Sequence, residues 1–198
     1  VISLLRIMSK DLTFAKSKFC DSAEEICIAA VQMRVGTKVA VNLKEAARLI
    51  DIAVMKGAKL VVLPEYFCFM GMKDTDKMVL REEEGSGPIQ DFLSKTARSY
   101  GIWLVGGSVP LVSSRPDKVR NSCLVYDDSG KQVARYDKIH LFNLRSGKEN
   151  YVEEETIEAG TKVVTLESPF GRIGLSICYD LRFPELYRSM EKVDIILA

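Results

Sequence analysis

The sequence predicts an α/β fold with a largely buried mixed sheet. In the first half of the chain, apolar runs of strand length alternate with amphipathic segments of helical period. In the second half, strand-like runs follow one another with turns between them. Alternation favours parallel strands joined by helices and short turns favour antiparallel hairpins, so one sheet is expected to contain both kinds of pairing.

The first helix lies between two apolar strands. Residues 26–33 (ICIAAVQM) form a continuous apolar run, which is typical of a strand buried on both faces. Residues 38–56 carry apolar side chains at helical spacing, and Gly57 follows as the expected end of that helix. The next apolar run, residues 59–65, is predicted to be a second buried strand that ends at Pro64.

A second helix and the remaining strands complete the prediction. The helix begins at Pro88 and ends at Gly101, which are favourable residues for those two positions. A turn at Ser129-Gly130 joins two of the strands, and the polar segment 143–161 is expected to be a long surface loop. Further strands are predicted at residues 102–112, 121–127, 131–138, 162–168, 172–178 and 193–198.

The regular pattern starts at residue 26. We therefore expect residues 1–25 to be a leader outside the domain and residues 26–198 to form the domain. The apolar stretch in the leader is too short and too charged for a secretory signal or a membrane span. The chain starts at Val1 and stops within the apolar run 193–198, so we expect a C-terminally truncated fragment of a longer protein.

The composition excludes several classes of function. The 28 basic and 27 acidic residues give a net charge of +1, with no basic stripe for nucleic acid or a membrane surface. Five scattered cysteines form neither a disulfide framework nor a CxxC pair, which favours a reducing, cytoplasmic compartment. With one histidine, no HExxH and no phosphate-binding glycine motif, neither a metal nor an organic cofactor is expected.

Three strand ends carry residues that could perform chemistry. Glu65, Lys138 and Cys178 each lie where a predicted strand ends, and such ends gather reactive groups in α/β proteins. A carboxylate, an ammonium and a thiol could serve as base, electrophilic stabiliser and nucleophile. The thiol needs a base or a nearby positive charge at neutral pH, and the backbone N–H of Tyr179 could help to bind an oxyanion.

Each candidate also has a structural interpretation. A cysteine at a strand end is more often a buried packing residue than a nucleophile. After Cys178, the residues Asp180, Arg182 and Glu185 are most simply explained as a structural ion-pair cluster near the site. His140, the sole histidine, could pair with the cysteine as in a Cys–His hydrolase, but a histidine in the apolar IHLF is more often a hydrogen-bonded packing residue.

At the three candidate positions the sequence resembles the nitrilase superfamily of carbon–nitrogen hydrolases. LPEYF contains Glu65, RYDKIHLF contains Lys138, and GLSICYDLRFPE contains Cys178, in the order of the family's Glu-Lys-Cys triad. Any one of these stretches is a weak signal, and the three together are highly specific. The resemblance extends from about Ile26 to the end of the chain.

The resemblance implies a fold and a reaction. The family fold is an α-β-β-α sandwich, and the family reaction is hydrolysis of a carbon–nitrogen bond through a cysteine thioester, without a cofactor. A second family glutamate, which orients the lysine and the substrate, aligns best with Glu153, with Glu154 as the alternative. Family members commonly form homodimers or larger homo-oligomers, and the implied partner of this site is a small amide.

Within the superfamily, CYDLRFPEL looks closest to the deaminated glutathione amidases and the omega-amidases, and RFPEL leans toward the first. The preferred function is therefore hydrolysis of a linear carboxamide such as deaminated glutathione. An omega-amidase or an N-carbamoyl amino acid amidohydrolase is the alternative enzyme. The alternative from another class is an inactive, truncated scaffold or dimerisation module that retains the motifs.

Overall fold

The computed structural model describes residues 2–8, 12–15, 26–147 and 149–198, and its largest element is a seven-stranded mixed sheet. The strand order is β2-β1-β3-β4-β5-β6-β7. β1, β3, β4 and β5 pair in parallel, whereas β2 and the hairpin strands β6 and β7 are antiparallel to their neighbours. The predicted mixed sheet is confirmed. Its strands are β1 (Ile2–Met8), β2 (Leu12–Ala15), β3 (Ile26–Gln32), β4 (Leu60–Val62), β5 (Trp103–Val112), β6 (Val119–Tyr126) and β7 (Gln132–Asp137).

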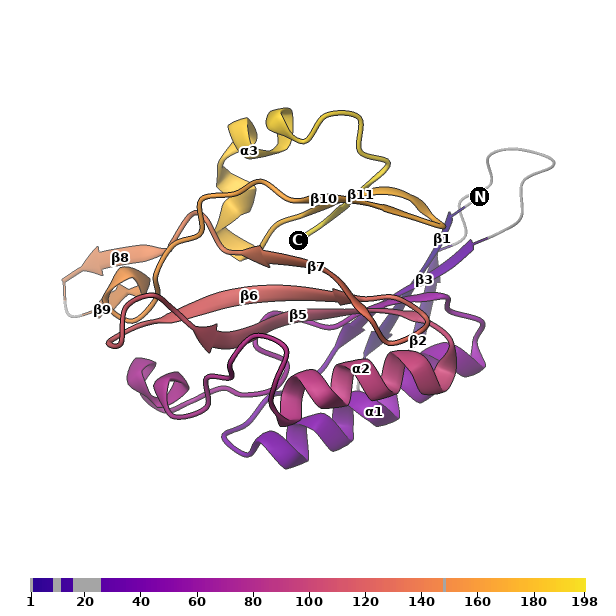
Figure 1. Cartoon of the computed structure of the whole chain (residues 1–198), viewed down its shortest axis with the longest axis horizontal. Helices are drawn as coiled ribbons and strands as arrows, with labels where there is room; N and C mark the ends of the chain where they lie inside the picture. The colour runs from indigo at the N-terminus through magenta and orange to yellow at the C-terminus, as the bar shows by residue number, and fades with distance from the viewer. Residues whose placement is uncertain (1, 9–11, 16–25, 148) are drawn as a thin grey trace.

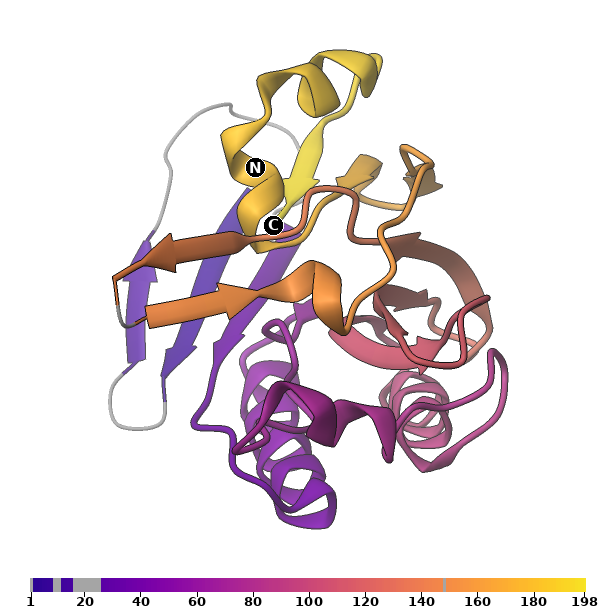
Figure 2. The same cartoon turned by 90° about the vertical axis from the view of Figure 1, so that its left-hand side faces the viewer.

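Helices cover one face of this sheet and a second sheet covers the other. α1 (Val39–Met55) and α2 (Pro88–Tyr100) lie side by side beneath the large sheet, as Figures 1 and 2 show. The second sheet, in the order β10-β11-β12, lies above it together with the short helix α3. These elements span Thr165–Ser168 (β10), Gly171–Leu175 (β11), Ile195–Leu197 (β12) and Pro184–Ser189 (α3). The layering agrees with the expected sandwich.

Successive residues of the central strands enter two different hydrophobic cores. In β4, Val61 packs toward the helices and Leu60 toward the second sheet; in β5, Leu104 and Val105 divide in the same way. Side chains of a strand alternate between its faces, so a strand covered on both sides must be apolar at every position. This explains why the central strands appear in the sequence as continuous apolar runs.

The two long helices follow the sequence signals closely. α1 buries Ala46, Leu49, Ile50 and Ala53 on one face, which is the spacing of a helix that packs on a sheet. α2 starts with Pro88 in its first turn, where a missing N–H costs nothing. It ends at Gly101 with φ +59°, a left-handed conformation that glycine adopts without steric cost.

The segment 143–161 and the first 25 residues contain strands that the sequence did not predict. The segment 143–161 was expected to be a long loop, which is wrong for its first part: β8 (Asn143–Ser146) and β9 (Glu149–Val152) form a hairpin. β1 and β2 fall within residues 1–25 and form one edge of the large sheet, where β1 pairs with β3. The proposed division into a leader and a domain stays a prediction, because the remaining residues of that stretch lie outside the described part of the chain.

Candidate active site

The structure brings Glu65, Lys138 and Cys178 to the same end of the two sheets. Glu65 follows β4, Lys138 is the first residue after β7, and Cys178 opens a short 3₁₀ helix, η3 (Cys178–Arg182), that follows β11. The Lys138 Nζ atom lies 3.4 Å from Glu65 Oε1. Glu65 and Lys138 both act on the pKa of the Cys178 thiol, which places the three groups near one another. Residues separated by 113 positions in the sequence therefore form one polar cluster.

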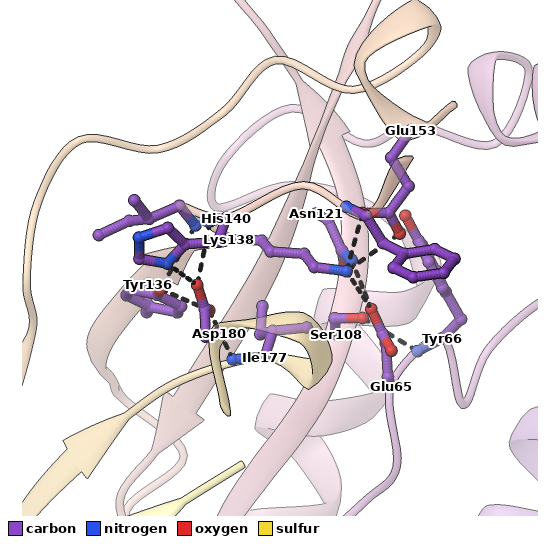
Figure 3. A network of polar contacts seen from close by, with 12 residues as sticks. Glu65, Tyr66, Ser108, Asn121, Tyr136, Lys138, His140, Glu153, Ile177 and Asp180 are labelled. Carbon is purple, nitrogen blue, oxygen red and sulfur yellow. Dashed lines mark hydrogen bonds and ion pairs between the residues drawn. The ribbon is translucent and has the colours of Figure 1, made fainter. Parts of the chain in front are cut away.

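A second glutamate binds the lysine from the opposite side. The Lys138 Nζ atom lies 3.0 Å from Glu153 Oε1 and 2.9 Å from Oε2 (Figure 3). Glu153 begins the short helix η2 (Glu153–Glu155), is 5% exposed, and accepts a 2.8 Å hydrogen bond from the Phe142 N–H. Glu154, the alternative from the sequence, is exposed, and its N–H faces the side chain of Asn143. Glu153 is therefore the glutamate that contacts the lysine.

Electrostatics keep Lys138 protonated. Burial alone would lower the pKa of this ammonium, because a charge loses its hydration inside the protein. The negative charges of Glu65 and Glu153, together with the hydrogen bond to Glu153, outweigh burial and raise the pKa of Lys138 above its ordinary value. Lys138 is therefore a cation at neutral pH, suited to stabilise developing negative charge and unsuited to act as a base.

The strands next to Glu65 hold its carboxylate in place. Asn121 on β6 is fully buried and donates a 2.8 Å hydrogen bond to Glu65 Oε1. On β5, a side chain at Gly107 would collide with the backbone carbonyls of Leu63 and Pro64, so glycine allows the segment before Glu65 to pack directly on this strand. Asn121 was not predicted from the sequence; an amide side chain beside the apolar run of β6 was the signal that could have identified it.

Cys178 has the backbone and exposure of a reactive residue. Among the cysteines that the structure describes, Cys178 is the exposed one. Its backbone adopts φ +49°, and that of Tyr66, next to Glu65, adopts φ +50°. Non-glycine residues in this left-handed region cost about 1–3 kcal/mol each and occur preferentially at functional sites. Tyr179 lies in the first turn of η3, where backbone N–H groups have no partner within the helix, and its ring packs edge-on against Phe142.

The Cys178 thiol is protonated at neutral pH. Partial burial raises its pKa above the ordinary value of a thiol, and the charge of Glu65 adds to this effect. Lys138 acts in the opposite direction but does not reverse the shift. The site therefore differs from one that holds a preformed thiolate–imidazolium pair, because here the thiol must lose its proton when the sulfur attacks.

We expect the rate at which iodoacetamide alkylates Cys178 to rise about tenfold per pH unit between pH 6 and 8. A raised pKa leaves the thiolate as a minor species over this range, so its fraction grows with pH. Cys68 and Cys123 provide internal references, because burial raises the pKa of each to about 12. Alkylation is followed by peptide mass spectrometry. A rate that is already constant below pH 7 would instead indicate a thiolate paired with an imidazolium.

A buried aspartate fastens the cysteine turn to the lysine segment. Asp180 is fully buried and accepts hydrogen bonds from the Tyr136 hydroxyl at 2.6 Å, the Ile177 N–H at 2.9 Å and the His140 N–H at 3.0 Å. Tyr136 and His140 flank Lys138 in sequence, and Figure 3 shows both residues beside the Asp180 carboxylate. Asp180 therefore fixes the position of Cys178 relative to Lys138. Tyr136 was not predicted as a site residue, although it is the tyrosine of the stretch RYDKIHLF.

The expected ion-pair cluster of Asp180, Arg182 and Glu185 is wrong. Arg182 and Glu185 are exposed, and within the described part of the chain no ion pair joins either residue to Asp180. Water solvates the two exposed charges, whereas the buried carboxylate takes its partners from the neighbouring backbone and side chains. His140 is one of these partners: its Nδ1 atom lies 2.7 Å from Asp180 Oδ1. The His140 ring also stacks on Phe183 at 3.7 Å, which agrees with a packing role.

A cavity of about 230 Å³ opens at this cluster. Glu65, Glu153 and Cys178 line it, which places the candidate base and the thiol on one small-molecule space. A cavity of this volume has room for several water molecules, so a small ligand fits. Its remaining walls include the aromatic rings of Phe69, Phe142 and Tyr151 and the polar side chains of Lys77, Lys73 and Asp74.

Among the described residues, no group of three or more His, Cys, Asp or Glu side chains converges in a way that could hold a metal ion. Within the same part of the chain, none of the helices has the length and apolar character needed to cross a bilayer.

Comparisons with known proteins agree on one family. The carbon-nitrogen hydrolase family model matches residues 27–198. A deaminated glutathione amidase from Synechocystis sp. (strain PCC 6803 / GT-S) is 39% identical over 168 residues, covering 83% of this chain and 61% of that protein. Omega-amidase NIT2 from Danio rerio is 39% identical over 166 residues, covering 83% and 58%. The crystal structure of Saccharomyces cerevisiae Nit3, a member of branch 10 of the nitrilase superfamily, has a TM-score of 0.68 and 32% identity, covering 79% and 56%. The chain thus spans about three fifths of the length of these curated relatives.

Proposed function

Because the chain belongs to the carbon–nitrogen hydrolase family, we propose that it hydrolyses linear carboxamides to a carboxylic acid and ammonia, with Glu65, Lys138 and Cys178 as its catalytic residues. The observation that carries this proposal is one cavity lined by the thiol and both glutamates, with the Lys138 ammonium held between the two carboxylates. A nucleophile, a base and a fixed cation within reach of one another are the components of acyl transfer.

The first half of the reaction forms a thioester. Glu65 accepts the proton of Cys178 as the sulfur attacks the amide carbon, and the Lys138 ammonium and the Tyr179 N–H stabilise the oxyanion. Glu65 then passes the proton to the leaving nitrogen, the C–N bond breaks and ammonia departs. The protonated state of the free thiol makes this transfer necessary, and Glu65 lines the same cavity as Cys178.

The second half consumes water. With the proton gone to ammonia, Glu65 is again a carboxylate and can remove a proton from a water molecule that attacks the thioester carbonyl. Lys138 and the Tyr179 N–H stabilise the second oxyanion, and the acid leaves as Cys178 recovers its proton. Glu153 acts by holding Lys138, since its carboxylate binds Nζ and is itself fixed by the Phe142 N–H.

Two substrate classes follow from the relatives, which are named deaminated glutathione amidases and omega-amidases. We propose deaminated glutathione as the substrate, in keeping with the RFPEL sequence; in this amide the leaving nitrogen belongs to cysteinylglycine, which departs in place of ammonia. An omega-amidase substrate such as alpha-ketoglutaramate or an N-carbamoyl amino acid is the alternative. The small cavity supports a slender, unbranched acyl chain at the thiol.

An assay of amide hydrolysis tests the proposal: the released amine, cysteinylglycine, is measured for deaminated glutathione, and released ammonia is measured for the other amides. The expected result is hydrolysis of deaminated glutathione or alpha-ketoglutaramate, with slower release from N-carbamoyl amino acids. A matched nitrile serves as the negative control, because the residues after Cys178 lack the Trp-Glu pair usual in true nitrilases. Failure to hydrolyse any of these amides would favour the inactive scaffold.

We further propose that the chain assembles as a homodimer or larger homo-oligomer in the cytoplasm. Members of the family that the sequence resembles commonly form homo-oligomers, which supports the proposed assembly. The scattered cysteines, which form no disulfide framework, support a reducing compartment such as the cytoplasm. Light scattering coupled to size-exclusion chromatography measures the mass of the assembly, and a monomeric mass contradicts it.

A further inference from the structure

Asn121 connects the candidate base to the candidate cation through both its side chain and its backbone. Its Nδ2 amide donates a 2.8 Å hydrogen bond to Glu65 Oε1, and its carbonyl accepts a 2.9 Å hydrogen bond from the Lys138 N–H. Asn121 lies on β6 and is fully buried. Two residues that lie 73 positions apart in the sequence therefore share one intermediary.

The side chain of Glu65 has more freedom than its backbone. The N–H of the next residue, Tyr66, donates a 2.9 Å hydrogen bond to the hydroxyl of Ser108, which is fully buried on β5, so the main chain is fixed at this point. The Glu65 side chain is 29% exposed, and a long side chain in contact with water has several accessible rotamers. The orientation of the carboxylate is therefore what a contact from β6 can control.

Asn121 holds Glu65 more closely than Lys138 does. The Lys138 Nζ atom lies 3.4 Å from Glu65 Oε1 and 2.9 Å from Glu153 Oε2, so its main partner is Glu153. The Asn121 amide approaches the same Oε1 atom of Glu65 to 2.8 Å, as Figure 3 shows. A distance of about 2.7–3.2 Å is usual for an N–H···O hydrogen bond. Asn121 is therefore the main contact that orients the carboxylate.

Both contacts fall on the same oxygen of the carboxylate. Asn121 and Lys138 each bind Oε1 of Glu65, and neither binds Oε2. A carboxylate oxygen that accepts hydrogen bonds from an amide and an ammonium is a poorer proton acceptor than the other oxygen of the same group. Oε2 is therefore the oxygen of Glu65 that is left to take up a proton.

A purely structural role does not explain the choice of an amide at this position. The Oδ1 atom of Asn121 is buried and has no hydrogen-bond partner among the residues that the structure describes. A buried polar atom without a partner costs stability, and amides that serve structure generally satisfy both of their ends. An apolar side chain of similar size would suit the site better if packing were the sole requirement.

We propose that Asn121 is the positioning residue of the base: by binding Oε1 of Glu65, it leaves Oε2 to carry the proton between the thiol and the substrate nitrogen. The inference rests on the proposed amidase function, in which Oε2 takes the Cys178 proton as the S–C bond forms and gives it to the leaving nitrogen as the C–N bond breaks. Asn121 acts through Glu65 and is not among the residues that line the substrate cavity.

Two variants of Asn121 test this assignment, with deaminated glutathione and alpha-ketoglutaramate as the amides. In Asn121→Leu we expect kcat to fall about 30- to 100-fold and KM to change less than about twofold, because the base is displaced while the cavity walls are unaltered. The Tm should not fall, because the substitution removes a buried oxygen that has no partner. Asn121→Asp keeps the shape of the side chain but replaces the N–H donor with an acceptor, so its kcat should fall at least as far.

Ser122→Ala is the matched control on the same strand. Ser122 is fully buried, and its hydroxyl donates a 2.6 Å hydrogen bond to Asp137 Oδ1 on the other face of the strand, away from Glu65. This variant should have a lower Tm and a kcat within about twofold of the wild type. The proposal is overturned if kcat and Tm fall together in Asn121→Leu, if the loss in that variant lies in KM, or if Asn121→Asp keeps the wild-type kcat.

Crystal structures separate this inference from the proposed function. If the wild-type chain hydrolyses neither amide, the proposed function fails, and the position of the Glu65 carboxylate still tests Asn121. A carboxylate that has one position in the wild type, and is displaced or takes two positions in Asn121→Leu, supports the positioning role. The same single position in both proteins refutes it.

Discussion

Replacing Cys178 with alanine is expected to abolish amide hydrolysis and to leave the fold intact. Removal of a nucleophile typically lowers kcat by about four to six orders of magnitude, since the remaining groups have no atom to acylate. Cys178 is exposed, so the free energy of unfolding should change by no more than about 0.5 kcal/mol. Ammonia release and urea unfolding measure the two effects separately.

Cys68 offers a matched control with the opposite expectation. Its side chain is fully buried in the core beside the helices, so Cys68→Ala should destabilise the protein by about 1 kcal/mol while hydrolysis persists. This contrast distinguishes loss of a nucleophile from loss of structure. Full activity in Cys178→Ala would mean that the thiol is a packing residue and that the amidase assignment is wrong.

Replacing Asp180 with alanine should cause the largest loss of stability. The substitution leaves the Tyr136 hydroxyl and the N–H groups of Ile177 and His140 buried without their acceptor. The substitution also removes the side-chain contact with His140. Together, the unsatisfied buried donors and the lost contact should lower the free energy of unfolding by about 3–5 kcal/mol. Chemical unfolding followed by circular dichroism measures the difference.

Glu185→Ala is the appropriate control for this prediction. Glu185 lies in the same segment and is exposed, and its loss should change stability by less than about 0.5 kcal/mol. In Asp180→Asn, whose side chain has nearly the same shape, we expect a smaller loss of stability together with reduced kcat, because the Cys178 turn is held less firmly against Lys138. Equal stabilities of Asp180→Ala and Glu185→Ala would refute the anchoring role.

The main elements could be predicted because local signals and tertiary packing agree. The run 26–33 and helix 38–56 correspond to β3 and α1, since both meet a hydrophobic core on the faces that their periods specify. The β8–β9 hairpin gave no such signal. β8 is exposed at every position, so no apolar alternation distinguishes it from a loop.

The candidate site was only partly accessible from the sequence. Glu65, Lys138 and Cys178 stood out because a reactive residue followed each strand. Asn121 and Tyr136 did not, because their roles depend on which strand lies beside which, and that order is set by the register of β5, β6 and β7. The partners of Asp180 were mistaken for the same reason: neighbours in sequence were exposed, and neighbours in space satisfied the carboxylate.

The most direct test is the intact mass of the protein quenched with acid during turnover of an amide substrate. The proposed mechanism predicts an added mass equal to that of the acid product minus one water, located on the peptide that contains Cys178. The adduct should be absent from Cys178→Ala and should disappear when the substrate is exhausted. Ammonia release at an undiminished rate with no acyl group on Cys178 would contradict the thioester, and with it the assignment of Glu65, Lys138 and Cys178 as the catalytic residues.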